Sequence, residues 1–276
     1  MIQELFHIGP ISISPFGIML AAAFFSAMIQ LRWGLKHLQA GDAEDASAIL
    51  LAAVLGGILG AKLYYAALYR DWRLVFDRAG LVWYGGFILG ALAVLWVARH
   101  RRMNAWSLAD AAAPALALGY AVGRIGCFLV GDDFGMPTNL PWGVKFPAGV
   151  PAPTTAGLMR HEYGASVPPE IPDSELIAVH PTQLYETLAA GAIWLIGVWM
   201  LRRGARRGMT TVVVVSLLAV ERFLVEFLRA KDDRFVGGLT LAQVLSLVAL
   251  VIMGVLWMRL RASNNGATPD GEKKRG

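Results

Sequence analysis

The sequence contains little of the chemistry that cysteine-based or histidine-based sites require. Cys127 is the single cysteine, which excludes an intramolecular disulfide framework and any CxxC redox or zinc motif. The five histidines are scattered and no HExxH pattern occurs, so we expect no metal. No lysine or arginine precedes the first apolar run, as a cleavable signal peptide would require. We therefore expect the first helix to remain in the mature protein.

Charge is also scarce. Only 16% of the residues are charged, whereas 56% are hydrophobic and the mean hydropathy is +0.53. These values indicate a polytopic membrane protein rather than a soluble domain. The net charge of +5 comes from arginines and lysines that lie between apolar runs, not on one basic face, so we expect no nucleic-acid partner.

Seven apolar runs are long enough to span a bilayer, which predicts an all-α protein with seven transmembrane helices. The runs are about Ile13–Leu31, Ala46–Leu68, Leu81–Ala98, Ala105–Val122, Gln183–Leu201, Gly208–Leu228 and Leu239–Leu260. The odd-numbered loops and the tail carry more arginine and lysine than the even-numbered loops. The positive-inside rule then places the N-terminus in the periplasm and the C-terminus in the cytoplasm.

The longest polar segment, from Arg124 to Thr182, lies between the fourth and fifth predicted helices. Nine of the 13 prolines fall between Pro137 and Pro181, which favours a compact, turn-rich periplasmic cap at about residues 125–181. We expect this cap to be inserted in one membrane domain of residues 1–261. Residues 262–276 are polar and predict a disordered cytoplasmic tail.

Small residues recur at helical spacing in the second and third runs. Gly56 and Gly60 form one such pair, and Gly86 and Gly90 form the other. Both pairs predict close helix packing. Lys62, in the outer half of the second run, either extends to the membrane interface or lines an anion cavity.

The stretch from Gly123 to Gly135 combines four glycines with Arg124 at the start of the long polar segment. Glycine permits close backbone approach, so the stretch predicts a loop that binds an anionic head group. The alternative is an interfacial turn whose arginine only meets lipid phosphate.

The sixth predicted helix ends with Arg222, Glu226 and Arg229 on one face. Charges in a spanning helix are costly, so this face should line a water-filled or bundle-facing site. Two arginines against one carboxylate would leave positive charge for a phosphate. Alternatively, Glu226 pairs with both arginines and the face is structural.

The fifth predicted helix opens with the sequence His180-Pro181-Thr182-Gln183-Leu184-Tyr185-Glu186. Pro181 favours helix initiation, and the positive helix terminus stabilises Glu186, so capping alone could explain that glutamate. His180 is either a structural hydrogen-bonding residue or a catalytic one.

Four stretches together resemble the bacterial prolipoprotein diacylglyceryl transferase family. They are Trp83 to Gly86, Gly123 to Gly135, His180 to Glu186, and Arg222 to Arg229, in the family's order. The resemblance implies transfer of a diacylglyceryl group from phosphatidylglycerol to the lipobox cysteine of a prolipoprotein signal peptide. It also implies an inner-membrane enzyme that needs no cofactor and whose active site faces the periplasm.

The resemblance also suggests which residues act. Arg124 and Arg222 are the first candidates for stabilising the departing phosphate, with Arg229 next. The catalytic candidates are Arg124, Arg222, Glu226, Tyr84 and His180. The substrate-binding candidates are Arg124, Arg222, Arg229, Gly85, Gly86, Gly126, Gly135, Tyr185, Glu186 and Lys62.

The sequence departs from the family pattern at three positions. Tyr84 stands where a histidine is common, Cys127 where an asparagine is expected, and Phe16 where a tyrosine is common. The group that removes the thiol proton therefore stays open among Tyr84, Glu186, Glu226, His180 and an arginine-lowered thiol pKa.

Other roles stay open as well. Cys127 is a packing residue or a covalent lipid carrier. Asp132 and Asp133 orient the loop or pair with Arg124, or else act as bases. The competing functions are a diverged paralogue with another acceptor and a non-catalytic lipid-binding or transport protein.

Overall fold

The computed structural model describes residues 4–8, 11–77, 80, 82–150, 152–231, 234–236 and 238–265. The described chain is mainly helical with little strand, and it divides into two compact units. The first unit contains Met1–Ala27 and Ala113–Gly276, and the second contains Met28–Ala112. The all-α prediction is confirmed.

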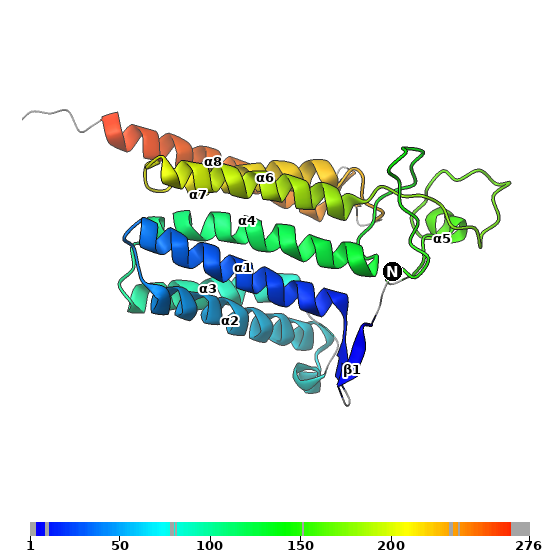
Figure 1. The fold of residues 1–276 in the computed structure, drawn as a ribbon, viewed down its shortest axis with the longest axis horizontal. Helices are drawn as coiled ribbons and strands as arrows, with labels where there is room; N and C mark the ends of the chain where they lie inside the picture. Colours follow the sequence, from blue (N-terminus) through cyan, green and yellow to red (C-terminus); the bar gives the residue numbers. More distant parts are fainter. Residues whose placement is uncertain are drawn as a thin grey trace, which may run out of the picture. The chain divides into compact units, whose positions relative to one another are not determined.

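A long helix is present at each of the seven predicted runs (Figure 1). These helices are α1 (Pro15–His37), α2 (Ala43–Tyr69), α3 (Trp83–His100), α4 (Ala105–Val130), α6 (Thr182–Arg202), α7 (Met209–Val225) and α8 (Leu241–Asn265). By length and composition, five described segments can cross a membrane: α1, α2, α4, α6 and Leu241–Ala262 of α8. The other two helices, α3 and α7, have 18 and 17 residues.

The remaining elements are short. A hairpin of β1 (Phe6–Ile8) and β2 (Ile11–Ile13) precedes α1, and β3 (Arg234–Val236) pairs with β4 (Leu239–Thr240) before α8. A 3-10 helix, η1 (Trp72–Phe76), follows α2. The helix α5 (Ala156–His161) lies between α4 and α6.

Helix α4 continues two turns beyond its predicted end. Gly123, Arg124 and Gly126 are helical, so the prediction of a glycine loop beginning at Arg124 was wrong. Inside a membrane the backbone hydrogen bonds of a helix cannot be exchanged for water, so glycine does not end a helix there as readily as in solution. A Cβ on Gly126 would lie 2.9 Å from Cβ of Met19 on α1, which makes this glycine a packing residue. The loop begins at Gly131, whose φ of +74° glycine adopts without strain.

Helix α7 ends before its predicted boundary, at Val225. Arg229 therefore lies outside the helix and is positioned by an antiparallel bridge to Gly135. A Cβ on Gly135 would meet the Leu228 carbonyl oxygen at 2.6 Å and the His180 carbonyl oxygen at 2.9 Å. Gly135 thus allows three backbone segments to meet beside Arg229.

The segment between α4 and α6 lies at the end of these two helices where α4 ends and α6 begins (Figure 1). It contains turns, the short α5 and an apolar core of its own. The buried members of this core are Phe134, Phe146, Met159, Ala165, Val179 and Ala230. The segment therefore has turns and a small apolar core, and its assignment as a periplasmic cap stays a prediction.

The second unit is built on close packing of α2 against α3. A Cβ on Gly56 would lie 2.8 Å from Cβ of Ala93, and a Cβ on Gly60 would overlap the carbonyl oxygen of Gly85. The glycines thus allow the two backbones to touch, as the small-residue pattern predicts.

Helix α8 reaches Asn265, so the predicted tail begins with helix rather than disorder at Ala262. The rest of that tail, residues 266–276, lies outside the described residues.

Candidate functional site

Three helices of the first unit meet over an apolar cluster of Ala113 and Ala117 from α4, Ile193 from α6 and Val214 from α7. Two helical turns, or seven residues, separate Ala117 from Arg124 and Ile193 from Glu186. That spacing returns each side chain to the same helix face, about 10 Å along the axis at 1.5 Å per residue. Because α4 and α6 run in opposite directions, Arg124 and Glu186 reach the same level, where they form an ion pair.

Glu186 is the central residue of the site. Its side chain is fully buried, and besides Arg124 it lies near two further arginines: Oε1 is 3.6 Å from Nη1 of Arg229 and 3.9 Å from Nη1 of Arg222. The Tyr120 hydroxyl donates a hydrogen bond to the same oxygen at 3.0 Å. Capping of α6 therefore does not account for Glu186, whose position lets three arginines share one carboxylate.

Asp133 joins two of these arginines from the loop. It pairs with Nη1 of Arg124 at 2.9 Å and with Nη2 of Arg229. Burial alone would raise the pKa of the Asp133 carboxyl, but Arg229 and Arg124 together lower its pKa below the ordinary value. Pairing of Asp133 with Arg124, one of the open predictions, is confirmed.

Glu226 completes the arginine cluster, which we define as Arg124, Arg222 and Arg229 with Asp133, Glu186 and Glu226. Oε2 of Glu226 lies 2.6 Å from Nη2 of Arg222 and 3.8 Å from Nε of Arg229. The structural reading of this face, in which Glu226 pairs with both arginines, is therefore observed.

The arginine cluster is balanced in charge, with three arginines and three carboxylates. The predicted surplus of positive charge counted Glu226 alone and was wrong, because Asp133 and Glu186 come from distant segments. Donor capacity remains at Arg222. Its side chain is 27% exposed, against 9% for Arg124 and 6% for Arg229. Its Nη1 is buried 3.9 Å from Oε1 of Glu186 and donates no hydrogen bond within the described residues.

The loop after α4 is tied to the start of α6. Oγ1 of Thr182 donates to the Asp133 carbonyl oxygen at 2.8 Å, and Nε2 of Gln183 donates to the Asp132 carbonyl oxygen at 2.5 Å. Neither Thr182 nor Gln183 was among the predicted site residues. Buried threonine and glutamine in the first turn of a helix indicate such anchoring only once the partner loop is known.

His180 and Tyr185 form a separate polar group. The Tyr185 hydroxyl accepts a hydrogen bond from Nε1 of Trp142 at 2.8 Å and lies 3.3 Å from Nδ1 of His180. Burial lowers the pKa of His180, so its imidazole is neutral at neutral pH. The structure thus shows a hydrogen-bonding role for His180, and catalysis by this residue stays a prediction.

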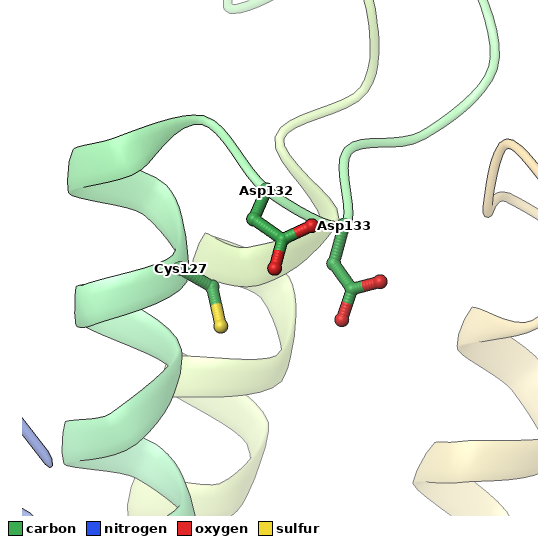
Figure 2. Close-up of side chains that lie close together, drawn as sticks. All are labelled: Cys127, Asp132 and Asp133. Atoms are coloured by element: carbon green, nitrogen blue, oxygen red, sulfur yellow. The ribbon is translucent and has the colours of Figure 1, made fainter. Parts of the chain in front are cut away.

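Cys127 lies at the edge of the arginine cluster. Figure 2 shows its thiol and the carboxyl groups of Asp132 and Asp133 directed toward a common space, and their ligand atoms lie within 4.8 Å of one another. However, Arg124 donates to Sγ of Cys127 at 3.6 Å and, with Arg229, engages both oxygens of Asp133. Two guanidinium groups at these atoms oppose a cation, and we assign no metal here.

Four predicted site residues belong to the second unit. Gly85 and Gly86 face Gly60 and Gly57 across the contact between α2 and α3, which gives both a packing role. Tyr84, in the first turn of α3, packs edge-on against Trp83 and is 38% exposed.

Lys62 is the fourth of these residues. Its Nζ donates to the carbonyl oxygen of Asp77, just after η1, at 2.5 Å. Substrate roles for these four residues stay predictions.

Most of the chain also resembles known proteins. The sequence profile described as prolipoprotein diacylglyceryl transferase matches residues 3–259. The chain belongs to this family. Its relatives include the phosphatidylglycerol–prolipoprotein diacylglyceryl transferase of Cupriavidus metallidurans, which is 33% identical over 95% of this chain and 94% of its own length.

Two further relatives carry the same name. The protein of Solidesulfovibrio magneticus is 33% identical over 95% of both chains. The protein of Synechococcus elongatus is 30% identical over 92% of this chain and 86% of its own. The profile match of this diacylglyceryl transferase includes every residue of the arginine cluster, so the geometry described above lies inside the shared region.

Proposed function

We propose that the arginine cluster is the place where this transferase moves the diacylglyceryl group of phosphatidylglycerol to the lipobox cysteine thiol of a prolipoprotein signal peptide. Family membership and the names of the relatives support the transfer itself. The observation that carries the location is the convergence of three arginines, from α4, α7 and the segment after α7, on one buried carboxylate.

The reaction places new negative charge where arginine acts best. Sulfur forms a bond to the glycerol carbon, the bond from that carbon to the phosphate oxygen breaks, and its electron pair stays on the oxygen of glycerol phosphate. Guanidinium groups held ready around that oxygen stabilise the transition state more than the neutral thiol and the singly charged diester. The thiol proton must leave, because the thiolate is the nucleophile.

The arginines differ in how available they are. Arg222 has the most exposed side chain of the three, so it meets the phosphate first. Arg124 and Arg229 are held by Asp133 and Glu186, which fixes their direction before substrate arrives. Such pre-organisation avoids reorienting the guanidinium groups during the reaction.

The proposed setting is a bacterial inner membrane crossed by seven helices, with the N-terminus in the periplasm and the C-terminus in the cytoplasm. Five apolar helices of spanning length, and α3 and α7 at two further apolar runs, support this arrangement. The arginine cluster and the inserted segment of about residues 125–181 then face the periplasm, where prolipoprotein signal peptides emerge. Phosphatidylglycerol reaches the site from the bilayer.

The test is reconstitution of the purified full-length protein with phosphatidylglycerol and a lipobox peptide, with the product read by mass. The expected product carries a diacylglyceryl thioether, and a peptide with serine in place of the cysteine stays unmodified. A folded protein that binds phosphatidylglycerol but forms no thioether would contradict the proposal. Modification of a cysteine peptide without a lipobox would instead support the diverged paralogue.

A further inference from the structure

Glu221 is a buried acidic residue that none of the interactions above uses. It lies on α7 and is only 7% exposed. Within the described residues, its Oε1 accepts no hydrogen bond and it has no arginine ion pair. By contrast, each of the three carboxylates in the arginine cluster pairs with at least two arginines.

Helix geometry places Glu221 at the level of the arginine cluster. It follows Val214 by seven residues, the same two-turn spacing that separates Ala117 from Arg124 and Ile193 from Glu186. Since all three reference residues belong to one apolar cluster, Glu221 faces the same three-helix junction as Arg124 and Glu186.

The groups around Glu221 come from each neighbouring helix. The charges of Arg124 on α4, Glu186 on α6, and Arg222 and Arg229 in and after α7 act on it electrostatically. Tyr120, one turn before Arg124, is influenced by both Glu186 and Glu221 and donates its hydroxyl to Glu186. From α8, which also packs on α7, Gln243 reaches the Phe223 carbonyl oxygen at 3.5 Å. Tyr120 therefore lies beside the arginine cluster, at the junction that Glu221 faces.

Proton affinity differs sharply between paired and unpaired carboxylates. Arginine neighbours favour the charged form, which is why Asp133 has a lowered pKa and is a weak base. A buried carboxylate that forms no ion pair gains more from protonation, because the proton removes a charge from a medium that solvates it poorly. Of the four acids at this junction, Glu221 therefore has the environment of a proton acceptor.

We propose that Glu221 is the residue that takes up and stores the thiol proton of the transfer reaction, reached through Glu186 and Tyr120. This proposal rests on the proposed function. As the S–C bond forms and the C–O bond breaks in one displacement, the thiol S–H proton passes to Glu186. Glu186 passes a proton to the Tyr120 hydroxyl oxygen, and the Tyr120 hydroxyl proton passes to Glu221. The stored proton then returns along the same groups to the oxygen of glycerol phosphate. The enzyme ends in its starting protonation state.

The decisive variants are Glu221→Gln and Tyr120→Phe, assayed in full-length protein with phosphatidylglycerol vesicles and a lipobox peptide. Loss of a general base lowers kcat by about 10²-fold or more, and we expect this loss in both variants without a change in KM for the lipid. In the wild type, kcat falls on the acidic side as the base becomes protonated, and both variants lose that acidic limb. Because the two residues act in one path, the double variant should be no slower than Glu221→Gln alone.

Thr210→Val is the matched control, since it removes another fully buried polar group from α7 away from the arginine cluster. It should keep wild-type kcat and the wild-type pH profile. Infrared difference spectra between acidic and alkaline pH contain the C=O bands of all carboxylic acids that become protonated. Subtracting the Glu221→Gln spectrum from that of the wild type should leave the band of one buried carboxylic acid.

Two results would overturn the proposal. One is a folded Glu221→Gln enzyme with wild-type kcat and an unchanged acidic limb. The other is a Tyr120→Phe enzyme that behaves in the same way, which decides the matter if Glu221→Gln does not fold. An inactive wild type would instead refute the proposed function, so the two failures are distinguishable.

Discussion

Removing the central carboxylate should expose how strongly the arginine cluster depends on balanced charge. Glu186→Gln keeps the shape of the side chain but leaves three arginines facing two carboxylates in a buried site. Breaking one partner of a buried ion pair typically costs about 3–5 kcal/mol. At about 2–4 °C per kcal/mol for a chain of this size, the variant should melt roughly 10 °C below the wild type.

A second substitution separates charge imbalance from lost packing. Arg124→Gln alone leaves Asp133 and Glu186 without one of their arginine partners and should also destabilise the protein by about 3 kcal/mol. Combining Glu186→Gln with Arg124→Gln restores equal numbers of positive and negative charges. We expect the double variant to be more stable than the sum of the singles by about 2 kcal/mol, within the range of measured coupling energies.

Thermal unfolding in detergent micelles, followed by circular dichroism, measures all four proteins. Glu44→Gln, an exposed change in the second unit, combined with Arg124→Gln provides the additive control. Additivity within about 0.5 kcal/mol for the Glu186 and Arg124 pair would refute the idea that charge balance holds the arginine cluster together.

Three further predictions address other parts of the molecule. Arg222→Ala should abolish transfer to the lipobox peptide, and it should also melt below the wild type because buried Glu226 loses its partner at 2.6 Å. Near-normal activity would exclude Arg222 as the phosphate ligand. Asp133→Asn should melt at a lower temperature than the wild type at neutral pH, because the pKa of Asp133 in the folded protein lies below its ordinary value. The charged carboxylate therefore stabilises the fold above the ordinary carboxyl pKa, and this stabilisation is lost as pH falls through the folded pKa. The difference in melting temperature should disappear over that range, and a constant difference would contradict the reasoning. Gly60→Ala should destabilise the α2–α3 contact by about 1–3 kcal/mol, since its Cβ would overlap the Gly85 carbonyl oxygen. Gly254→Ala, at a position with open space around it, is the control and should not destabilise the protein. Equal melting temperatures for the two variants would show that the α2–α3 contact adjusts.

Much of the fold could be predicted because membrane helices leave a strong signal in composition. Seven apolar runs gave seven long helices, and the glycine pairs gave the contact between α2 and α3. The ends were less predictable. Gly123 to Val130 carries residues that end helices in water, yet backbone hydrogen bonding in an apolar medium extends α4 through them.

The site could be predicted only in part, for a different reason. The sequence shows three charged residues in or beside apolar runs, namely Arg124, Arg222 and Glu226. A charge inside a membrane is costly in free energy, so its presence there indicates a function. The partners of these residues were visible only in part. Pairing of Asp133 with Arg124 was one of the open predictions, whereas Tyr120 looked like an ordinary helix residue, because its importance depends on which segments meet at Glu186.

Arg229 illustrates the limit of helical periodicity. It was expected to share a helix face with Arg222, but α7 ends at Val225 and the bridge to Gly135 positions Arg229 instead. A continued helix and the observed bridge would each place Arg229 beside Glu226. The predicted neighbour was therefore found, although the predicted helical geometry was wrong.

The ion pair between Arg124 on α4 and Glu186 on α6 has a consequence for how the protein is made. A ribosome delivers α4 to the membrane before α6 exists, and an arginine in a spanning segment opposes insertion by about 2.5–3.5 kcal/mol at the helix centre. Until α6 and α7 emerge from the ribosome, Arg124 must lie near the lipid head groups or inside the translocon. The length of the segment between α4 and α6 sets the time during synthesis for which Arg124 has no Glu186 to pair with. Assembly of this enzyme should therefore be sensitive to that length.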